Sequence, residues 1–273
     1  MHVRYPDRVT TSISTRTSLM TAAAILAAVT TLTACTAGTS APPKPDAAGT
    51  SASAAPAAPA ESEQPAPSVA ECDDVPLSAE ETIPGQALGD CIAAAMVAAG
   101  TGVQRVESSD GTSSVVQFAW TPDYAMSVDA GEQQVVIQGD TGWVKMPGSG
   151  WVQADPASTD HQVVMATGIV DLTRVFSDPR VLAAGFATSP TWTVVGEEPI
   201  PVDDADATTG WLVTPNSAMT ILGVSLSDVQ LWLRPDHLGA YFVGTGTMAG
   251  ISTTTSNTFL EWGGEVDIPT PRG

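Results

Sequence analysis

Basic residues are scarce in this chain of 273 residues, which holds 10 Lys and Arg against 30 Asp and Glu and carries a formal net charge of −20. Residues 1–34 contribute three Arg and one Asp, so the remainder carries −20 − 2 = −22. Such a surface repels phosphate backbones and anionic lipid headgroups. The composition therefore disfavours nucleic-acid binding and docking on a membrane through a polybasic segment.

Histidine and cysteine are equally scarce, with three of each. After the N-terminal leader only His161 and His237 remain, neither has a second His or Cys at metal-ligand spacing, and the chain has no GxSxG motif. We therefore expect no enzyme activity, no cofactor and no metal. An acidic cluster could bind calcium, but it lacks the Gly and the final Glu of a calcium loop, and a solvated loop is favoured. Its members are Glu197, Glu198, Asp203, Asp204 and Asp206.

Long apolar runs are missing too. The uncharged Ala/Leu/Val/Thr run near the N-terminus, residues 18–33, is shorter and richer in Thr than the roughly 20 apolar residues that cross a bilayer. It follows a basic leader, which is the pattern of a secretory signal peptide over residues 1–34. Residues 32–36, Leu-Thr-Ala-Cys-Thr, resemble the lipobox of bacterial lipoproteins. The resemblance implies cleavage before Cys35 and a diacylglyceryl group on its sulfur, which places the protein on the outer face of the cell membrane. The alternative is an ordinary signal peptide with an incidental Cys.

Residues 35–70 contain no aromatic residue and, from residue 36, consist almost entirely of Ala, Pro, Ser, Thr and Gly. Such a composition cannot offset the entropy lost on folding. We expect a tether that spans on the order of 30 Å as a coil and about 100 Å when fully extended. Residues 71–273 would then form one domain.

Two cysteines remain in the exported part of the chain, Cys72 and Cys91. Oxidising conditions outside the cytoplasm favour a disulfide between them. The bridge would connect the end of the tether to the first helix and order the acidic segment 71–82. A redox or metal role is the weaker alternative, because the pair has neither CxxC spacing nor a neighbouring His in the sequence.

The domain begins with a helical pattern over residues 84–100, where Leu88, Ile92 and Met96 recur at helical spacing and Gly100 follows. Short β segments separated by turn residues come next and favour an antiparallel meander. An apolar helical insert over 163–176, with a second helix starting at Asp178-Pro179, interrupts them. The expected strands are 103–107, 115–120, 124–128, 134–138, 143–146 and 151–153 before the insert, and 191–196, 210–214, 229–234, 240–247 and 253–262 after it.

The order of these parts resembles the actinobacterial LppX/LprG-type lipoproteins of the LolA-like group. The phrases that carry the resemblance are residues 139–144 (GDTGWV) with Trp151, 231–236 (LWLRPD) and 261–269 (EWGGEVDIP). It implies an α+β, mostly antiparallel fold, in which a curved half-barrel sheet wraps around a few short helices and encloses an apolar cavity. It also implies binding or carriage of an acyl lipid or lipoglycan at the cell envelope.

The chain offers only about three short helices to cover many strands, so the sheet either curls until its faces meet or leaves a space. Plain core packing is the alternative for each residue that could line such a space. The candidate lining residues are Phe118, Trp120, Met126, Val128, Ile137, Val175, Phe176, Leu182, Phe186, Leu231 and Leu233.

Seven tryptophans are expected to lie mostly buried at strand ends. Trp232 is the exception, because strand alternation turns it away from Leu231 and Leu233 and toward the outer face. Two hypotheses follow. The first is a carrier of a hydrophobic ligand, and the second is a non-enzymatic interaction or sensing module of the same fold that docks an envelope protein through a surface such as Trp232.

Overall fold

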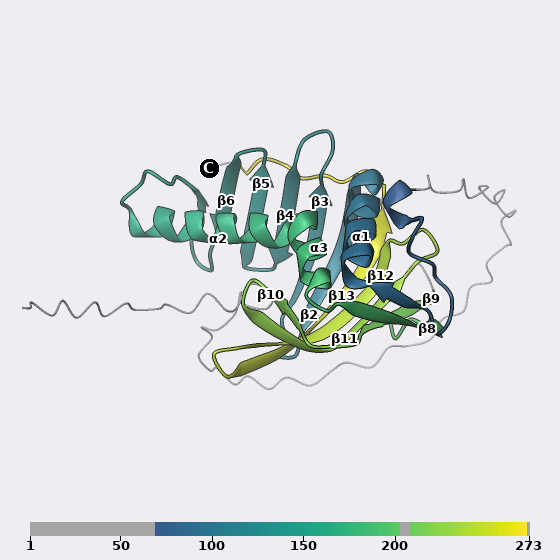
Figure 1. Cartoon of the computed structure of the whole chain (residues 1–273). Helices are drawn as coiled ribbons and strands as arrows, with labels where there is room; N and C mark the ends of the chain where they lie inside the picture. The colour runs from purple at the N-terminus through teal and green to yellow at the C-terminus, as the bar shows by residue number, and fades with distance from the viewer. Residues whose placement is uncertain (1–68, 203–207, 272–273) are drawn as a thin grey trace, which may run out of the picture.

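A computed structural model describes residues 69–202 and 208–271. The predicted signal peptide, Cys35 and nearly all of the tether lie outside these residues. The described part is a 13-stranded sheet in which every pairing is antiparallel, with three α-helices and one 3₁₀ turn. The mostly antiparallel α+β class agrees with the expectation, and the sheet has two short strands more than the eleven expected from the sequence. Figure 1 shows the sheet bending around the helices. The helical elements are η1 (Ala70–Cys72), α1 (Gly85–Ala99), α2 (His161–Ser177) and α3 (Pro179–Ala187).

The sheet is open, because its order runs β1-β8-β9-β11-β12-β13-β2-β3-β4-β5-β6-β7 with β10 added beside β11. The strands β1 and β7 therefore form its two edges. The strands are β1 (Thr82–Pro84), β2 (Thr101–Ser108), β3 (Ser113–Ala119), β4 (Ala125–Ala130), β5 (Gln133–Gln138), β6 (Thr141–Lys145), β7 (Trp151–Gln153), β8 (Thr191–Pro199), β9 (Thr209–Pro215), β10 (Met219–Ile221), β11 (Val224–Leu233), β12 (Gly239–Met248) and β13 (Ile251–Trp262).

Helix α1 forms where the apolar spacing predicts it. Its buried face includes Leu88, Ile92 and Met96, and it ends at Gly100, whose φ of 78° suits a residue without a side chain. The disulfide between Cys72 and Cys91 is present, with the two Cα atoms 4.6 Å apart, and it holds η1 against this helix. The prediction of a bridge between the N-terminal segment and the first helix is therefore confirmed.

The helical insert is two helices that meet at one residue. The Asp160 carboxylate caps α2 by accepting hydrogen bonds from the backbone N–H groups of Gln162 and Val163. Asp178 ends α2 and caps α3, accepting from the N–H of Arg180, and Pro179 occupies the first helical position. Both start signals are those that helices prefer, which is why this junction could be read from the sequence.

The apolar interior divides into two clusters. The first lies between α1, α3 and the strands on the β8–β11 side, and the second lies between α2 and strands β3–β6. Trp120 and Trp262 pack against both clusters, with their ring centroids 6.3 Å apart and Phe118 4.4 Å from Trp120. These aromatic rings therefore connect the two halves of the interior.

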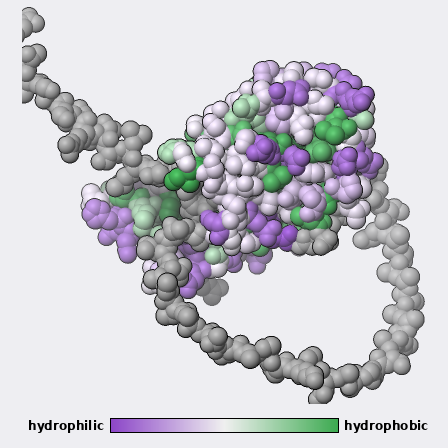
Figure 2. Space-filling view, turned by 90° about the horizontal axis from the view of Figure 1, so that it is seen from below, coloured by the Kyte–Doolittle hydropathy of each residue, from purple (hydrophilic) through white to green (hydrophobic). Residues whose placement is uncertain are grey.

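A third, smaller cluster lies on the opposite face of the sheet and corrects one prediction. Trp232 does lie on the face opposite Leu231 and Leu233, but it is only 6% exposed. Ile200, the residue directly after β8, packs in the same cluster, and Tyr241 on β12 packs against the Trp232 ring at a centroid distance of 5.4 Å. Figure 2 shows the underside of the molecule, where hydrophobic residues form several small patches separated by hydrophilic ones.

Candidate functional site: the apolar layer beneath α2

Helix α2 covers the part of the sheet made by β3, β4, β5 and β6. The side chains between them are mostly apolar, because many of the strand residues that point toward the helix are Val, Ile, Phe or Met. Thr173 is the buried polar residue of α2, and its hydroxyl donates to the Ile169 carbonyl. We call this set the α2 layer. Its buried members are Val116, Phe118, Met126, Val135, Ile137 and Val144 from the sheet, with Ala166 and Val170 from the helix.

The helix touches the sheet most closely at Gly142 on β6. A Cβ atom there would collide with the side chain of Val170, so the absence of a side chain lets α2 approach the strand directly. The Val170 side chain is 2% exposed. At this point the layer is packed at the density of an ordinary protein core.

Toward the start of α2 the packing is looser. A pocket with a volume of about 130 Å³ lies between the first turns of the helix and the turn that joins β6 to β7. This is less than half of the roughly 300 Å³ at which ligand pockets usually begin, so in this arrangement the pocket has no room for a whole lipid. Its lining residues are Val144, Met146, Pro147, Ser149, Val152, Gln162, Met165 and Ala166.

The two ends of α2 are held very differently. At its C-terminal end the Ser177 carbonyl accepts a hydrogen bond from Trp120 Nε1 at 3.3 Å, and the Ser177 hydroxyl lies 2.6 Å from the Tyr124 hydroxyl. Arg174 donates to the Gly139 carbonyl at 2.6 Å and lies over the Tyr124 ring. Burial raises the pKa of Tyr124, which therefore stays protonated at neutral pH. These contacts attach this end of the helix to the β3–β4 and β5–β6 connections.

The N-terminal half of α2 relies mainly on apolar contact. Thr167 Oγ1 accepts a hydrogen bond from the Asp155 N–H at 2.9 Å, which ties the middle of the helix to the preceding loop. Val164 and Met165 are 51% and 47% exposed. Two large apolar side chains near the start of one helix thus remain in contact with solvent.

The predicted lining residues fall into both clusters. Phe118, Met126 and Ile137 are buried in the α2 layer, and Trp120 and Val128 pack against it. Phe186, Leu231 and Leu233 are buried in the other cluster, with Leu182 at its margin.

Val175 is the residue for which the prediction is wrong. It is 39% exposed, because its position on α2 turns it away from the sheet, and Phe176 beside it is only half-buried. The list of candidate lining residues also leaves out Val116, Val135, Val144 and Val170 of the layer. Strand alternation places Val116 on the same face as Phe118, two residues away, so Val116 could have been included.

The polar candidates do not form a reactive site among the described residues. Glu197 and Glu198 are exposed at the end of β8, and Thr209 donates a hydrogen bond to Glu197 at 2.9 Å. Asp203, Asp204 and Asp206 lie outside the described residues. His161 is exposed at the first position of α2.

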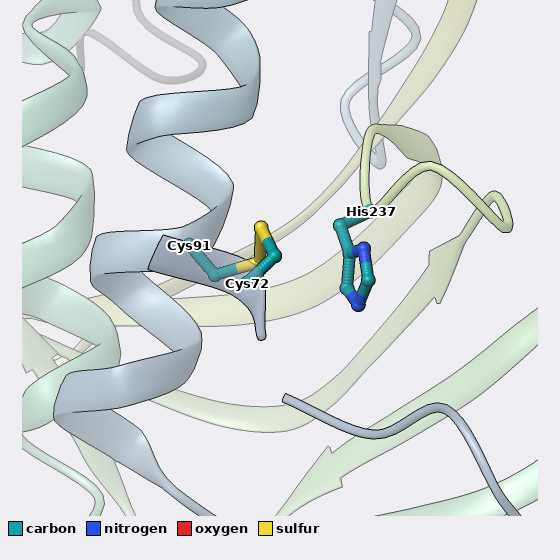
Figure 3. Close-up of side chains that lie close together, drawn as sticks. All are labelled: Cys72, Cys91 and His237. Atoms are coloured by element: carbon teal, nitrogen blue, oxygen red, sulfur yellow. A yellow bond between two sulfur atoms is a disulfide. The ribbon is translucent and has the colours of Figure 1, made fainter. Parts of the chain in front are cut away.

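His237 lies beside the disulfide, as Figure 3 shows, and its ligand atom is within 4.8 Å of both sulfurs. The sulfurs are bonded to each other and so are not thiolate ligands, and His237 Nε2 is 2.8 Å from the Val75 carbonyl oxygen. The disulfide and His237 together therefore connect the N-terminal segment, α1 and the β11–β12 turn.

No protein-family model and no curated protein sequence matches this chain. Among solved structures, the chain is similar to the Mycobacterium tuberculosis lipoprotein LppX, with 15% identity over 68% of this chain and 98% of that one and a TM-score of 0.42. It is also similar to a LolA superfamily protein from Nitrosomonas europaea, with 10% identity over 68% and 96% of the two chains and a TM-score of 0.31. At such identities the similarity concerns the fold, so the function is argued from this chain's own residues.

Within the described part of the chain, no helix has the length and hydropathy needed to span a bilayer.

Proposed function

We propose that this protein is a lipoprotein of the cell envelope, anchored through Cys35, that binds an acyl lipid or lipoglycan between α2 and strands β3–β6 without enzyme activity. The observation that carries the proposal is the α2 layer. Its buried residues are apolar side chains, it is covered by a single helix, and that helix is hydrogen-bonded to the β3–β4 and β5–β6 connections at one end and packed loosely at the other.

Ligand binding would require α2 to swing about its C-terminal end near Ser177. Residues 161–170 span about 15 Å of helix, so a modest tilt would separate the start of α2 from β6 and β7 by several ångströms and enlarge the existing pocket. Opening exposes apolar surface of both the helix and the sheet, and contact of this surface with water is unfavourable. A bound acyl chain would cover the same surface. The empty protein is therefore expected to be closed, and a hydrophobic ligand to select the open form.

The chemistry around the pocket suits a neutral or hydroxyl-bearing headgroup. Gln162 and Ser149 are the polar members of its lining, and both can donate and accept hydrogen bonds. The net charge of −20 disfavours anionic headgroups unless their charge stays far from the protein. An acyl chain beneath α2 with a sugar headgroup at the pocket mouth would satisfy both requirements.

A crosslink across the pocket tests this proposal. In a Cys35→Ser background, Ser149→Cys and Gln162→Cys place one thiol on each side of the pocket, and a short bismaleimide can join them. We expect the crosslinked protein to lose uptake of a pyrene-labelled phospholipid, measured by fluorescence, while the same variant before crosslinking retains it.

Thr245 and Thr254 provide the matched control, because their hydroxyls lie 2.9 Å apart on the exposed surface of β12 and β13. Joining cysteines at these two positions should leave lipid uptake unchanged. Uptake that survives the crosslink across the pocket would contradict binding beneath α2.

The second candidate is an interaction module that docks an envelope protein. Trp232 does not support this function, because its side chain is buried. The exposed side chains of Val164 and Met165 and the small volume of the pocket do support it. A photocrosslinking residue at position 165, used in living cells, separates the two functions. One stoichiometric protein partner would support docking, whereas crosslinks to lipid would support carriage.

A further inference from the structure

The turn ends of two neighbouring hairpins contain no charged residue in a chain where 15% of residues are charged. Residues 208–227, which include β9 and β10, and residues 238–260, which include β12 and nearly all of β13, have no Asp, Glu, Lys or Arg. In a protein of net charge −20, one part of the surface is thus free of the negative charge that covers the rest.

The turns of both hairpins lie at the same end of the sheet. Strands β11 and β12 are paired with Ser225 opposite Thr247, which brings the β10–β11 turn (Leu222 and Gly223) level with the β12–β13 turn (Ala249 and Gly250). Figure 1 shows the β10–β11 hairpin on the side of the domain away from η1, which is drawn in dark blue. We call these four residues and Ile251 the paired tips.

Acidic groups near the paired tips stay behind them. The exposed Asp228 lies four residues along β11 from Val224, the first residue after the β10–β11 turn. The β2–β3 turn contains Asp110, and the N–H of Ser109 in that turn donates to the Thr254 carbonyl. From Thr254 the β13 strand continues three more residues to Ile251, which is about 10 Å at the rise of a strand. The paired tips therefore project past the acidic turn.

The side chains at the paired tips are apolar and exposed. Leu222 is 51% exposed with a φ of 49°, and Ile251 is 65% exposed. Two-residue hairpin turns with positive φ at both positions favour Asn or Gly, and a leucine there raises the energy of the turn. Turn formation therefore does not explain Leu222, whereas a partner that accepts an exposed apolar side chain does.

We infer that the paired tips contact a lipid bilayer and insert Leu222 and Ile251 at the boundary between headgroups and acyl chains. Protein interfaces need on the order of 1,000 Å² of matching surface, which two narrow turns do not offer. A bilayer accepts isolated apolar side chains, and the absence of charge removes the desolvation cost that the remaining surface would carry.

The inference rests on the proposed membrane anchoring at Cys35. An anchor followed by a tether that spans on the order of 30 Å would keep the domain at a high local concentration near the bilayer. A contact too weak to recruit a free protein would then hold the domain in one orientation.

The test supplies the anchor chemically, so that its outcome is independent of natural lipidation and of ligand uptake. The chain from residue 35 onward contains every described residue, and because Cys72 and Cys91 are bonded to each other, Cys35 is left to react with a maleimide-headgroup lipid in phosphatidylcholine vesicles. Hydrogen exchange read by mass spectrometry should be slower at residues 219–224 and 247–252 than in the same chain coupled to soluble polyethylene glycol.

The variant Leu222→Asn with Ile251→Thr keeps residues suited to the turn and the strand and should abolish this protection without lowering the melting temperature. Val97→Thr, an equally mild change at an exposed apolar residue of α1, should leave the protection unchanged. Equal exchange on vesicles and in solution would overturn the inference, as would protection that persists in the double variant. Lipid uptake that survives the crosslink across the pocket, or no uptake before crosslinking, would overturn the carrier function and leave this result unaffected.

Discussion

At the scale of single residues, α1 and α3 touch through glycine. A Cβ on Gly89 would lie 2.5 Å from the Ala183 carbonyl oxygen, a backbone atom that cannot move aside without displacing α3. We therefore expect Gly89→Ala to lower the free energy of unfolding by about 1–3 kcal/mol, measured by urea denaturation. Gly168 in α2 is the control, since a Cβ there meets nothing within 4 Å, and Gly168→Ala should raise stability by about 0.5–1 kcal/mol. Similar effects at both positions would contradict the close packing of α1 on α3.

Asp178 combines a helix cap with an ion pair. Its hydrogen bond from the Arg180 guanidinium, at 2.7 and 3.0 Å, lowers the pKa of the carboxyl group, and the Arg180 N–H adds to this. A lowered folded-state pKa gives stability that is present above the unfolded value near 3.9 and is lost as the pH falls through the folded value. Asp178→Ala should cost about 1 kcal/mol at pH 7, and the difference from the unmodified protein should shrink below about pH 4.

Denaturation curves between pH 2 and 7 would measure this effect. Asp178→Asn keeps a capping side chain, so its free energy of unfolding at pH 7 should fall by less than that of Asp178→Ala. A loss for Asp178→Ala that is the same at pH 3 and pH 7 would show that the ionised carboxylate contributes nothing.

Individual lining residues could be predicted only in part. Strand alternation placed Phe118, Met126 and Ile137 correctly, because a strand has just two faces. On α2 the apolar character of Val175 wrongly suggested that it faces the interior. A helix presents residues all around its circumference, and several apolar residues of α2 face solvent.

At the scale of elements, the disulfide closes the N-terminal segment over α1. The two cysteines are 19 residues apart, and in the chain-entropy model a loop of this size contributes about 3 kcal/mol. Replacing both with serine should lower the free energy of unfolding by about 2–4 kcal/mol, measured by urea denaturation. Lipid uptake should persist in this variant, because the bridge lies outside the α2 layer. Loss of uptake in a protein that still folds would mean that the segment takes part in binding.

Most elements followed from local sequence, whereas β1 and β10 did not. Each has only three residues, and β1 ends in a proline, so neither gives an apolar alternation long enough to detect. They exist because longer neighbours, β8 and β11, offer unpaired edges. The cover over Trp232 was missed for a similar reason, since Ile200 reaches it only through tertiary folding.

At the scale of the whole molecule, one open antiparallel sheet bends around three helices and encloses two apolar clusters joined by aromatic rings. Composition and the order of elements predicted this class of fold. They could not predict whether the interior is hollow, because that depends on how side chains from distant strands fill one space. The pocket of about 130 Å³ between α2 and the β6–β7 turn is too small for a whole lipid. Under the proposed function, carriage of a lipid would therefore depend on movement of α2.

Native mass spectrometry of the mature protein, purified in detergent-free buffer from its own cell envelope after Cys35→Ser substitution, tests the central claim most directly. The account predicts a fraction of molecules with one bound acyl lipid or lipoglycan. After this lipid is extracted, the Ser149→Cys, Gln162→Cys variant should bind it again when it is offered, but not once the two cysteines have been crosslinked. A protein that carries no lipid in any fraction, with or without the crosslink, would contradict a binding site beneath α2.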